Sequence, residues 1–345
     1  MRYNKIANST TMNQPTWKFE QTQIVGCKKP VFKVTTPELI TRLSKQVNLY
    51  WKGEQHDNEL RFPGAQPVSI EKKDFHILKS NPYLVCAKLD GERYFVFATK
   101  VPANLNLPRK NLMNVTFLVN RRLDFYIITE TFSDEVYQNK TLLDGELINN
   151  ELVIHDIIII RGEIVKDKTF DIRWKLCDDF LIKNFRNNSN VNTLNIRLKK
   201  FYPLQLIKDL FRDIKNNNIK SDGIVFYPVN DKVKYRCQDN LFKWKPPGKH
   251  TIDFKIKINE NEVELLTWGN RKTIVYEKLP LSIFDELKGF KDNQVIEFKV
   301  ENDEFIPILI RHDKPVGNNL YTIRKTLLNV RENIREIDLC KINLF

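Results

Sequence analysis

The chain has 345 residues, of which 41% are hydrophobic and 11% aromatic, so its composition excludes a disordered polymer and favours a globular protein with room for two cored domains. A net charge of +13 favours polyanionic partners such as nucleic acid or nucleotides. Five scattered cysteines without a C-x-x-C pair argue against structural zinc and for a reducing compartment, and the sequence shows neither a run long enough to cross a bilayer nor a secretion signal.

The first predicted elements are helices. Residues 36–50 begin with a Thr cap and Pro37 and carry apolar side chains at helical spacing, and a shorter helix is expected over residues 69–78. The polar residues up to about position 20 show no periodicity, so no element is predicted there.

Residues 83–99 read YLVCAKLDGERYFVFAT, which predicts two strands joined by a tight turn at Asp90-Gly91. Lys88 then lies where the first strand ends. A lysine there can act as a nucleophile when part of its amine is neutral, which neighbouring cations and removal from water favour. Taken alone, such a turn in a lysine-rich chain is more often an ordinary exposed turn, so the interpretation depends on the residues that follow.

The middle of the chain predicts a sheet followed by two helices. Strands are expected at residues 115–120, 125–129, 142–148 and 151–160, and helices at 172–185 and 203–216. The apolar run at 157–160 indicates a buried strand. The Asn-rich segment 187–195 is interpreted as a solvated connector without a function.

The last third predicts a boundary and a small β-barrel. A polar turn at Ser221-Asp222-Gly223 enters an apolar strand, and residues 241–245 alternate strictly before Pro246-Pro247-Gly248, which is the best domain boundary in the sequence. Short strands beyond it favour a barrel, and a helix is expected over 320–337. These strands are predicted at residues 251–258, 262–268, 273–276, 294–300 and 305–311.

Several polar side chains fit one chemistry, attack by a lysine on a nucleotide α-phosphate. Such a reaction needs cations for the phosphate charge and carboxylates for a metal or for ribose. Lys88 is the candidate nucleophile, and Lys243 and Lys245, two residues apart on a strand, point the same way. Asp222 and Glu146 are the candidate carboxylates and the candidate metal ligands.

The order of these motifs resembles the covalent nucleotidyltransferase superfamily of ATP-dependent DNA ligases, RNA ligases and mRNA capping guanylyltransferases. The likeness runs from Phe62-Pro63-Gly64 to near the end and is greatest to the capping guanylyltransferases, especially the compact stand-alone form of large DNA viruses. The motifs that carry it are Lys88-x-Asp90-Gly91-x-Arg93, Asn120-Arg121, Asp144-Gly145-Glu146, Ser221-Asp222-Gly223, Phe242-Lys243-Trp244-Lys245-Pro246 with Thr251-Ile252-Asp253-Phe254, and Arg311-His312-Asp313-Lys314.

The resemblance implies an α+β fold. It implies a GTP-binding nucleotidyltransferase domain of antiparallel sheets with flanking helices over residues 1–247, completed by a C-terminal helix at 321–345. Residues 248–320 are expected to form an OB-fold β-barrel that closes over the nucleotide in the first step and opens to admit RNA.

The resemblance also implies a two-step reaction. Lys88 takes GMP from GTP, releasing pyrophosphate, and GMP then passes to the 5′-diphosphate end of RNA as a GpppN cap. By position, Asp222 would hold Mg²⁺ or Mn²⁺ and Glu146 the ribose. The other expected nucleotide contacts are Asp90, Gly91, Arg93 and Arg121 near ribose or phosphate, Lys243 and Lys245 at the α-phosphate, and Arg311, Asp313 and Lys314 at the β and γ phosphates.

Two positions depart from the family pattern. His155 stands where an aromatic residue usually stacks on guanine, and it is expected to contact the base, with a core or solvent-facing histidine as the alternative. Asn120 replaces the usual Asp before Arg121. Lys199 aligns with a position that contacts the guanine oxygen in viral relatives, although a charged loop is the alternative.

Two other functions remain open. A DNA or RNA ligase using ATP would also suit Lys88-Leu89-Asp90-Gly91, and a silent nucleic-acid-binding module would keep the fold without the chemistry. Motifs for triphosphatase or methyltransferase chemistry are not found, so separate proteins with those activities, or RNA polymerase, are the expected partners. The expected location is intracellular and soluble, without membrane contact: host cytoplasm, nucleus or virion if the protein is viral.

Overall fold

The computed structural model describes residues 15–52, 60–108, 110–287, 289–312 and 314–342. The chain divides into two compact units. The first contains residues 1–67, 89–202 and 227–241, and the second contains 68–88, 203–226 and 242–345. The expected domain limits at 247 and 320 stay a prediction, because these units are made of interleaved segments with other limits.

The first unit is built on a large, mostly antiparallel sheet with the order β1-β2-β7-β6-β5-β8-β9-β10, in which β11 pairs parallel with β9. This sheet supplies the strands predicted between residues 92 and 160. Its strands are β1 Phe19–Thr22, β2 Val31–Val34, β5 Glu92–Pro102, β6 Leu112–Val119, β7 Phe125–Ile128, β8 Thr141–Ile148, β9 Glu151–Ile160, β10 Glu163–Ile164 and β11 Asn195–Leu198.

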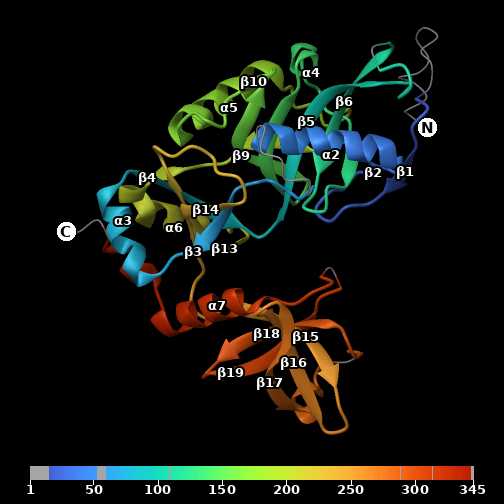
Figure 1. Cartoon of the computed structure of the whole chain (residues 1–345). Coiled ribbons are helices and arrows are strands. Elements are labelled where there is room, and N and C mark those ends of the chain that lie inside the picture. The colour runs from blue at the N-terminus through green and yellow to red at the C-terminus, as the bar shows by residue number, and fades with distance from the viewer. Residues whose placement is uncertain (1–14, 53–59, 109, 288, 313, 343–345) are drawn as a thin grey trace. The chain divides into compact units, whose positions relative to one another are not determined.

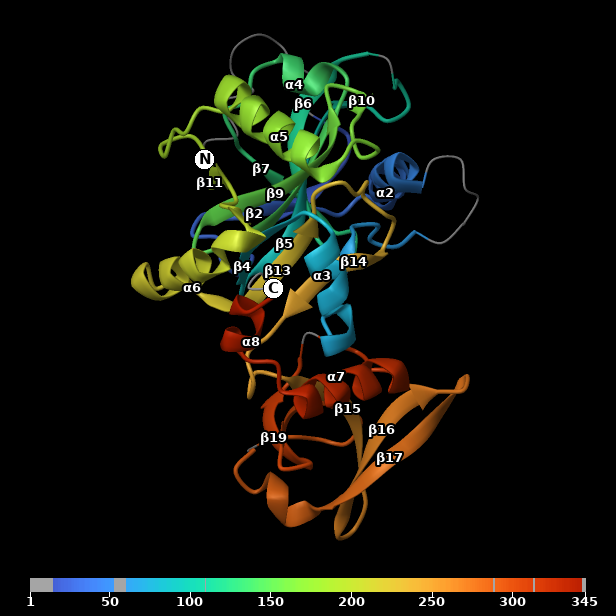
Figure 2. The same ribbon diagram turned by 90° about the vertical axis from the view of Figure 1, so that its left-hand side faces the viewer.

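Successive side chains of a strand point to opposite faces of its sheet, and β5 has buried side chains at successive positions. Both faces of the sheet are therefore buried at β5. On one face Phe95 stacks on Trp51 of α2 (Pro37–Lys52), with 5.7 Å between ring centroids. On the other, Val96 shares a core cluster with Phe180 of α5 (Phe170–Asn184). Helices α2 and α5 therefore cover opposite faces (Figures 1 and 2). The short helix α4 (Glu135–Gln138) follows β7.

A second sheet has the order β12-β4-β13-β14-β3, so β4 and β13 are neighbours. In the part within the second unit, Ile224 of β13 lies opposite Trp244 of β14, and Phe211 of α6 packs edge-on against Trp244. The elements are β3 Gln66–Ser69, η1 Lys72–Asp74, α3 Phe75–Ser80, β4 Tyr83–Leu89, β12 Tyr202–Pro203, η2 Leu204–Leu206, α6 Ile207–Asn216, β13 Ser221–Pro228 and β14 Cys237–Trp244.

The remainder of the second unit contains an antiparallel sheet with the order β17-β16-β15-β18-β19. Phe254, Phe298 and Phe305 meet edge to face in its core, together with Ile323 of α7. This strand path has two ends, so closure into an OB barrel stays a prediction. The elements are β15 Thr251–Ile258, β16 Glu262–Gly269, β17 Lys272–Pro280, η3 Leu281–Phe284, β18 Val295–Glu301, β19 Glu304–Ile310 and α7 Leu320–Glu332.

The C-terminal segment contacts residues far away in the sequence but in the same unit. Asn329 of α7 donates to the carbonyl oxygen of Ile70 at 2.8 Å, and the indole of Trp244 donates to the carbonyl of Ile334 at 2.8 Å. The single helix predicted over 320–337 is wrong, because α7 ends where Asn333 adopts a left-handed φ of 48° and α8 (Glu336–Cys340) follows.

The apolar run predicted as a buried strand lies in β9, where Ile157, Ile158 and Ile159 are fully buried, which confirms the prediction. All five cysteines are free thiols. Among the described residues, none of the helices combines the length and the apolar character that crossing a membrane requires.

Candidate active site

A lysine–aspartate group forms where β4 meets β13 in the second unit. The amine of Lys88 lies 2.6 Å from Oδ1 of Asp222, and the amine of Lys245 lies 2.9 Å from Oδ2 of the same carboxylate. About a quarter of the Lys88 side chain is exposed, at 25%. The nucleophile candidate is therefore positioned by a carboxylate and accessible to a ligand.

The charges of this group affect one another. Burial alone would raise the pKa of Asp222, but the adjacent charges and hydrogen bonds of Lys88 and Lys245 lower it overall, so the carboxylate is ionised at neutral pH. The sequence did not single out His250. Burial lowers the pKa of His250, and so do the charges of Lys245 and Lys243, so both lysines lie close enough to affect one imidazole.

The first unit holds a buried ionic group at the start of β5. Arg93 donates from Nε and Nη2 to both oxygens of Asp144, which is 2% exposed, and Nη1 donates to the carbonyl of Ala65. Nε2 of His155 lies 3.3 Å from Asp144, while Nδ1 of His155 has no hydrogen-bond partner among the described residues. The ring of Tyr227 lies 6.3 Å from that of His155, measured between centroids.

The Arg93–Asp144 pair stays ionised. Burial would raise the pKa of Asp144, but Arg93 and His155 lower it well below its ordinary value. Burial would lower the pKa of Arg93, and Asp144 raises it instead. Arg121 belongs to the same electrostatic neighbourhood: removal from water and the like charge of Arg93 lower its pKa, while Asp144 and Glu146 oppose that shift.

Glu146 and Lys199 face each other in the same unit. The Lys199 amine lies 3.5 Å from Oε2 of Glu146, and the lysine is only 6% exposed. The backbone N–H of Lys199 donates to the carbonyl of Ile154 at 2.7 Å, which extends the parallel pairing of β11 with β9. Lys199 therefore lies just after β11, buried and paired with a carboxylate, and its contact with guanine stays a prediction.

The turn after Lys88 is shaped by a close backbone approach. A Cβ atom on Gly91 would lie 2.5 Å from the carbonyl oxygen of Leu147, so only glycine fits there without displacement. Asp90, beside it, is exposed.

The cations near the end of the chain are held by acidic residues. Nη1 of Arg311 lies 3.1 Å from Asp253 and 3.0 Å from Glu297. Lys314 also pairs with Asp253. Asp313, the third residue predicted in this motif, lies outside the described residues.

Comparison with known proteins decides the family. The family model described as "mRNA capping enzyme, catalytic domain" matches residues 20–247, which is more than half of the chain. The chain belongs to this mRNA capping enzyme family. The match covers Lys88, Asp222 and Lys245, as well as the Arg93–Asp144 pair.

Curated capping-enzyme relatives agree. The mouse mRNA-capping enzyme is 27% identical over 84% of this chain and 50% of its own length, and the zebrafish enzyme is 26% identical over 84% and 50%. The mRNA-capping enzyme subunit alpha of Schizosaccharomyces pombe is 26% identical over 81% of this chain and 79% of its own. The chain thus spans about half the length of the two animal proteins, and the expected likeness to the viral form stays a prediction.

Solved structures of DNA ligases also have some likeness to this capping-enzyme family member. A mycobacterial DNA ligase D complexed with ATP and MES covers 73% of this chain and 95% of its own, with 11% identity and a TM-score of 0.39.

The two predicted metal ligands, Asp222 and Glu146, each pair with lysine side chains. The described residues include no group of three or more His, Cys, Asp or Glu side chains placed to hold an ion. Magnesium in phosphoryl-transfer sites commonly takes one or two carboxylates, with phosphate oxygens and water as the other ligands. A single carboxylate can serve in this way once a nucleotide supplies phosphates. Asp222 contacts Lys88 and Lys245, and Glu146 pairs with Lys199, so both stay predicted metal ligands.

Sequence reasoning missed the acidic partners. Asp144 was quoted only as part of a motif, and Asp253 likewise, although each pairs with a predicted cation. A usable signal was present for Asp144, because an aspartate inside a strand with buried neighbours needs a cationic partner. Asn120, which stands where the family pattern has an Asp, donates its side-chain amide to Asp124 at 3.0 Å.

Proposed function

We propose that this chain is an mRNA guanylyltransferase, which transfers GMP from GTP to the 5′-diphosphate end of RNA through a covalent intermediate on Lys88. The observation that carries the proposal is the contact of one carboxylate, Asp222, with both Lys88 and Lys245 inside the region that matches the capping-enzyme family. A nucleophilic amine beside a second cation and a carboxylate is what phosphoryl transfer through lysine requires.

In the first step, the lone pair of the Lys88 amine attacks the α-phosphorus of GTP. A nitrogen–phosphorus bond forms, the bond from that phosphorus to the β-bridging oxygen breaks, and pyrophosphate leaves. The amine loses its proton to solvent or to a carboxylate. Asp222 orients the amine, and Lys245 with Lys243 offsets the charge that develops on the α-phosphate. A divalent ion held by Asp222 would add a further positive charge at the phosphates.

In the second step, a β-phosphate oxygen of the RNA 5′-diphosphate attacks the same phosphorus. The nitrogen–phosphorus bond breaks, Lys88 recovers its proton, and the product is a GpppN end. The first step is reversed by pyrophosphate, because the phosphoramidate and the phosphoanhydride are both activated bonds.

The remaining residues would bind GTP. Glu146 would contact the ribose, and Arg93 and Arg121 the ribose or phosphates, with Asp144 holding Arg93 in place. Asp90 and Gly91 would shape the turn beside the nucleotide. His155 and Lys199 would contact guanine.

Residues near the C-terminus would bind the β and γ phosphates of GTP, which leave as pyrophosphate. We propose that the sheet of β15–β19 is an OB-fold, and that Arg311, Asp313 and Lys314 engage the β and γ phosphates. Asp253 and Glu297 already hold the Arg311 side chain, which reduces the entropy lost on binding. Separate triphosphatase and methyltransferase proteins, and RNA polymerase, are the proposed partners.

Nucleotide choice tests this proposal. Wild type and Lys88→Ala would be incubated with α-labelled GTP or ATP and magnesium and separated by denaturing electrophoresis. We expect a labelled protein band from GTP, no band from ATP, and no band from the variant. Label from ATP alone would establish a ligase instead, and no label from either nucleotide would leave a nucleic-acid-binding module.

A further inference from the structure

The loop that joins β13 to β14 carries a cluster of cations that the reaction chemistry does not use. Residues 229–236 read VNDKVKYR, in which Lys232, Lys234 and Arg236 alternate with Val233 and Tyr235. Lys232 and Lys234 are exposed. Asp239 lies 4.0 Å from Lys234, the limit of an ion pair, while none of the described carboxylates pairs with Lys232.

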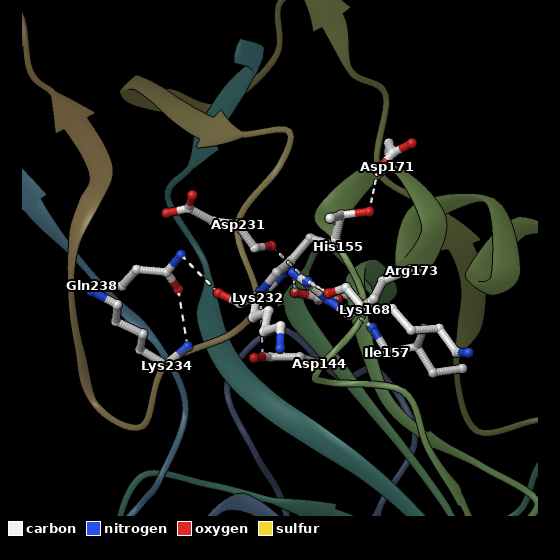
Figure 3. Close-up of polar contacts among 12 residues, drawn as sticks. Asp144, His155, Ile157, Lys168, Asp171, Arg173, Asp231, Lys232, Lys234 and Gln238 are labelled. Carbon is white, nitrogen blue, oxygen red and sulfur yellow. Dashed lines mark hydrogen bonds and ion pairs between the residues drawn. The ribbon is translucent and has the colours of Figure 1, made fainter. Parts of the chain in front are cut away.

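The backbone of this loop is held by hydrogen bonds to residues outside it. Val233 is buried, at 8% exposure, and its N–H donates to the carbonyl of Lys166 at 3.1 Å. The side chain of Gln238, which is 4% exposed, accepts from the N–H of Lys234 and donates to the carbonyl of Lys232, both at 3.3 Å. Figure 3 shows this amide bridging the two lysines' backbone atoms.

A buried arginine fixes the same loop from the side of α5. Arg173, at 2% exposure, donates from Nε and Nη2 to Asp156 at 2.8 and 2.9 Å. Its Nη1 donates to the carbonyls of Asp231 at 3.1 Å and Lys168 at 2.7 Å, so one guanidinium ties two loops to the strand that carries Asp156 (Figure 3).

Lys232 and Lys234 therefore lie on a loop whose backbone is held in place by hydrogen bonds. Because Val233 is buried between two exposed neighbours, the lysine amines project into solvent on a backbone that is already held in place. The guanidinium of Arg236 lies over the ring of Tyr235, 5.3 Å from its centroid. A ligand that binds here loses little entropy in ordering the loop.

We propose that this loop, residues 229–236, binds the sugar–phosphate backbone of the acceptor RNA downstream of its 5′ end. Lys232 and Lys234 would contact phosphates, and the Tyr235–Arg236 pair would support an unstacked base. Alternating cations beside an aromatic ring suit single-stranded nucleic acid, which offers charge and a flat base face together. The inference rests on the proposed function, because that function supplies the RNA substrate.

The test compares a long and a short acceptor. Lys232→Ala/Lys234→Ala would be assayed for GMP transfer to a 5′-diphosphate RNA of about 20 nucleotides, several OB-fold-sized sites long, and to a 5′-diphosphate dinucleotide. We expect KM for the long RNA to rise about tenfold, the slope of log affinity against log salt to fall by about 1.4, and dinucleotide transfer to match wild type. Lys232→Arg/Lys234→Arg keeps both positive charges, so its KM for the long RNA and its salt slope should equal those of wild type.

The matched control is Lys272→Ala/Lys278→Ala, which removes the same charge from two exposed positions on β17. It should leave the salt slope at the wild-type value. Long-RNA transfer by Lys232→Ala/Lys234→Ala that equals wild type would overturn the inference and leave an acidic protein as the ligand of the loop. An equal loss with the dinucleotide would overturn it as well. If wild type takes no GMP from GTP at all, the proposed function fails instead.

Discussion

At Asp222 a single carboxylate contacts two lysine amines, at 2.6 and 2.9 Å, and this sharing has a consequence for the rate of the first step. Asp222→Asn keeps the shape but removes the negative charge that orients Lys88. We expect the initial rate of GMP-adduct formation to fall about 100-fold, while the melting temperature changes little because the side chain is partly exposed.

The control for this variant is Asp239→Asn, which changes an aspartate that is 79% exposed and 4.0 Å from its lysine. It should keep the wild-type rate of adduct formation. An Asp222→Asn protein as fast as this control would show that Asp222 neither orients the amine nor holds a metal.

Glu130 makes the stability of the first unit depend on pH. Burial raises the pKa of Glu130 to about 8, although the N–H of Leu194 and the charge of Lys29 oppose the shift, and Oε2 has no hydrogen-bond partner among the described residues. The unfolded chain releases this proton near pH 4 to 5, so stability falls as pH rises from there to about 8, by at most about 1.4 kcal/mol per pH unit.

Glu130→Gln removes this proton but keeps an oxygen that can accept from Leu194. Urea unfolding at pH 5 and pH 8 should show the variant gaining stability relative to wild type as the pH rises. Parallel pH profiles for the two proteins would mean that Glu130 is ionised in the folded state.

At the scale of elements, the pairing of β13 with β14 depends on Gly223. Its φ is +151°, and a Cβ there would lie 1.9 Å from the carbonyl oxygen of Trp244. Gly223→Ala should therefore lower the free energy of unfolding by about 3 kcal/mol or more. Gly248→Ala, where φ is +80° and no atom lies within 4 Å, should cost only about 1–2 kcal/mol. Equal losses measured by urea unfolding would contradict this account.

Periodic segments were predictable, and short or irregular ones were not. The helix at Pro37–Lys52 and the strands Thr141–Ile148 and Glu151–Ile160 follow their sequence patterns closely. Two-residue to four-residue strands such as β10 and β12 carry no periodicity that could reveal them. The Asn-rich connector is exposed over residues 187–191, as predicted, but differs at Asn192. Asn192 is 2% exposed, and its side chain accepts from the backbone and hydroxyl of Thr131.

Those site residues whose charge the proposed chemistry requires could be predicted from the sequence. Lys88, Asp222 and Lys245 were chosen for charge, and the structure brings them into contact. The partnership of Arg93 with Asp144 depends on the register of β5 against β8, in which Arg93 faces Glu146 and Phe95 faces Asp144. Sequence alone did not give that register, so the pair was missed.

At the scale of the whole molecule, residues far apart in sequence assemble the second unit. Residues 68–88, 203–226 and 242–345 belong to it, and the contacts of Asn329 with Ile70 and of Trp244 with Ile334 join its ends. The family match stops at residue 247, yet residues beyond it contact Trp244 of β14, the strand that pairs with the Asp222 strand β13.

The central claim is that Lys88 carries GMP, and peptide mapping tests it most directly. Wild-type protein would be incubated with GTP and magnesium, digested, and analysed by mass spectrometry, with a second sample chased with 5′-diphosphate RNA before digestion. We predict one GMP residue on the peptide that contains Lys88, and its loss in the chased sample as GpppN ends appear on the RNA. A GMP adduct on any other residue, or an adduct that RNA does not remove, would contradict the account.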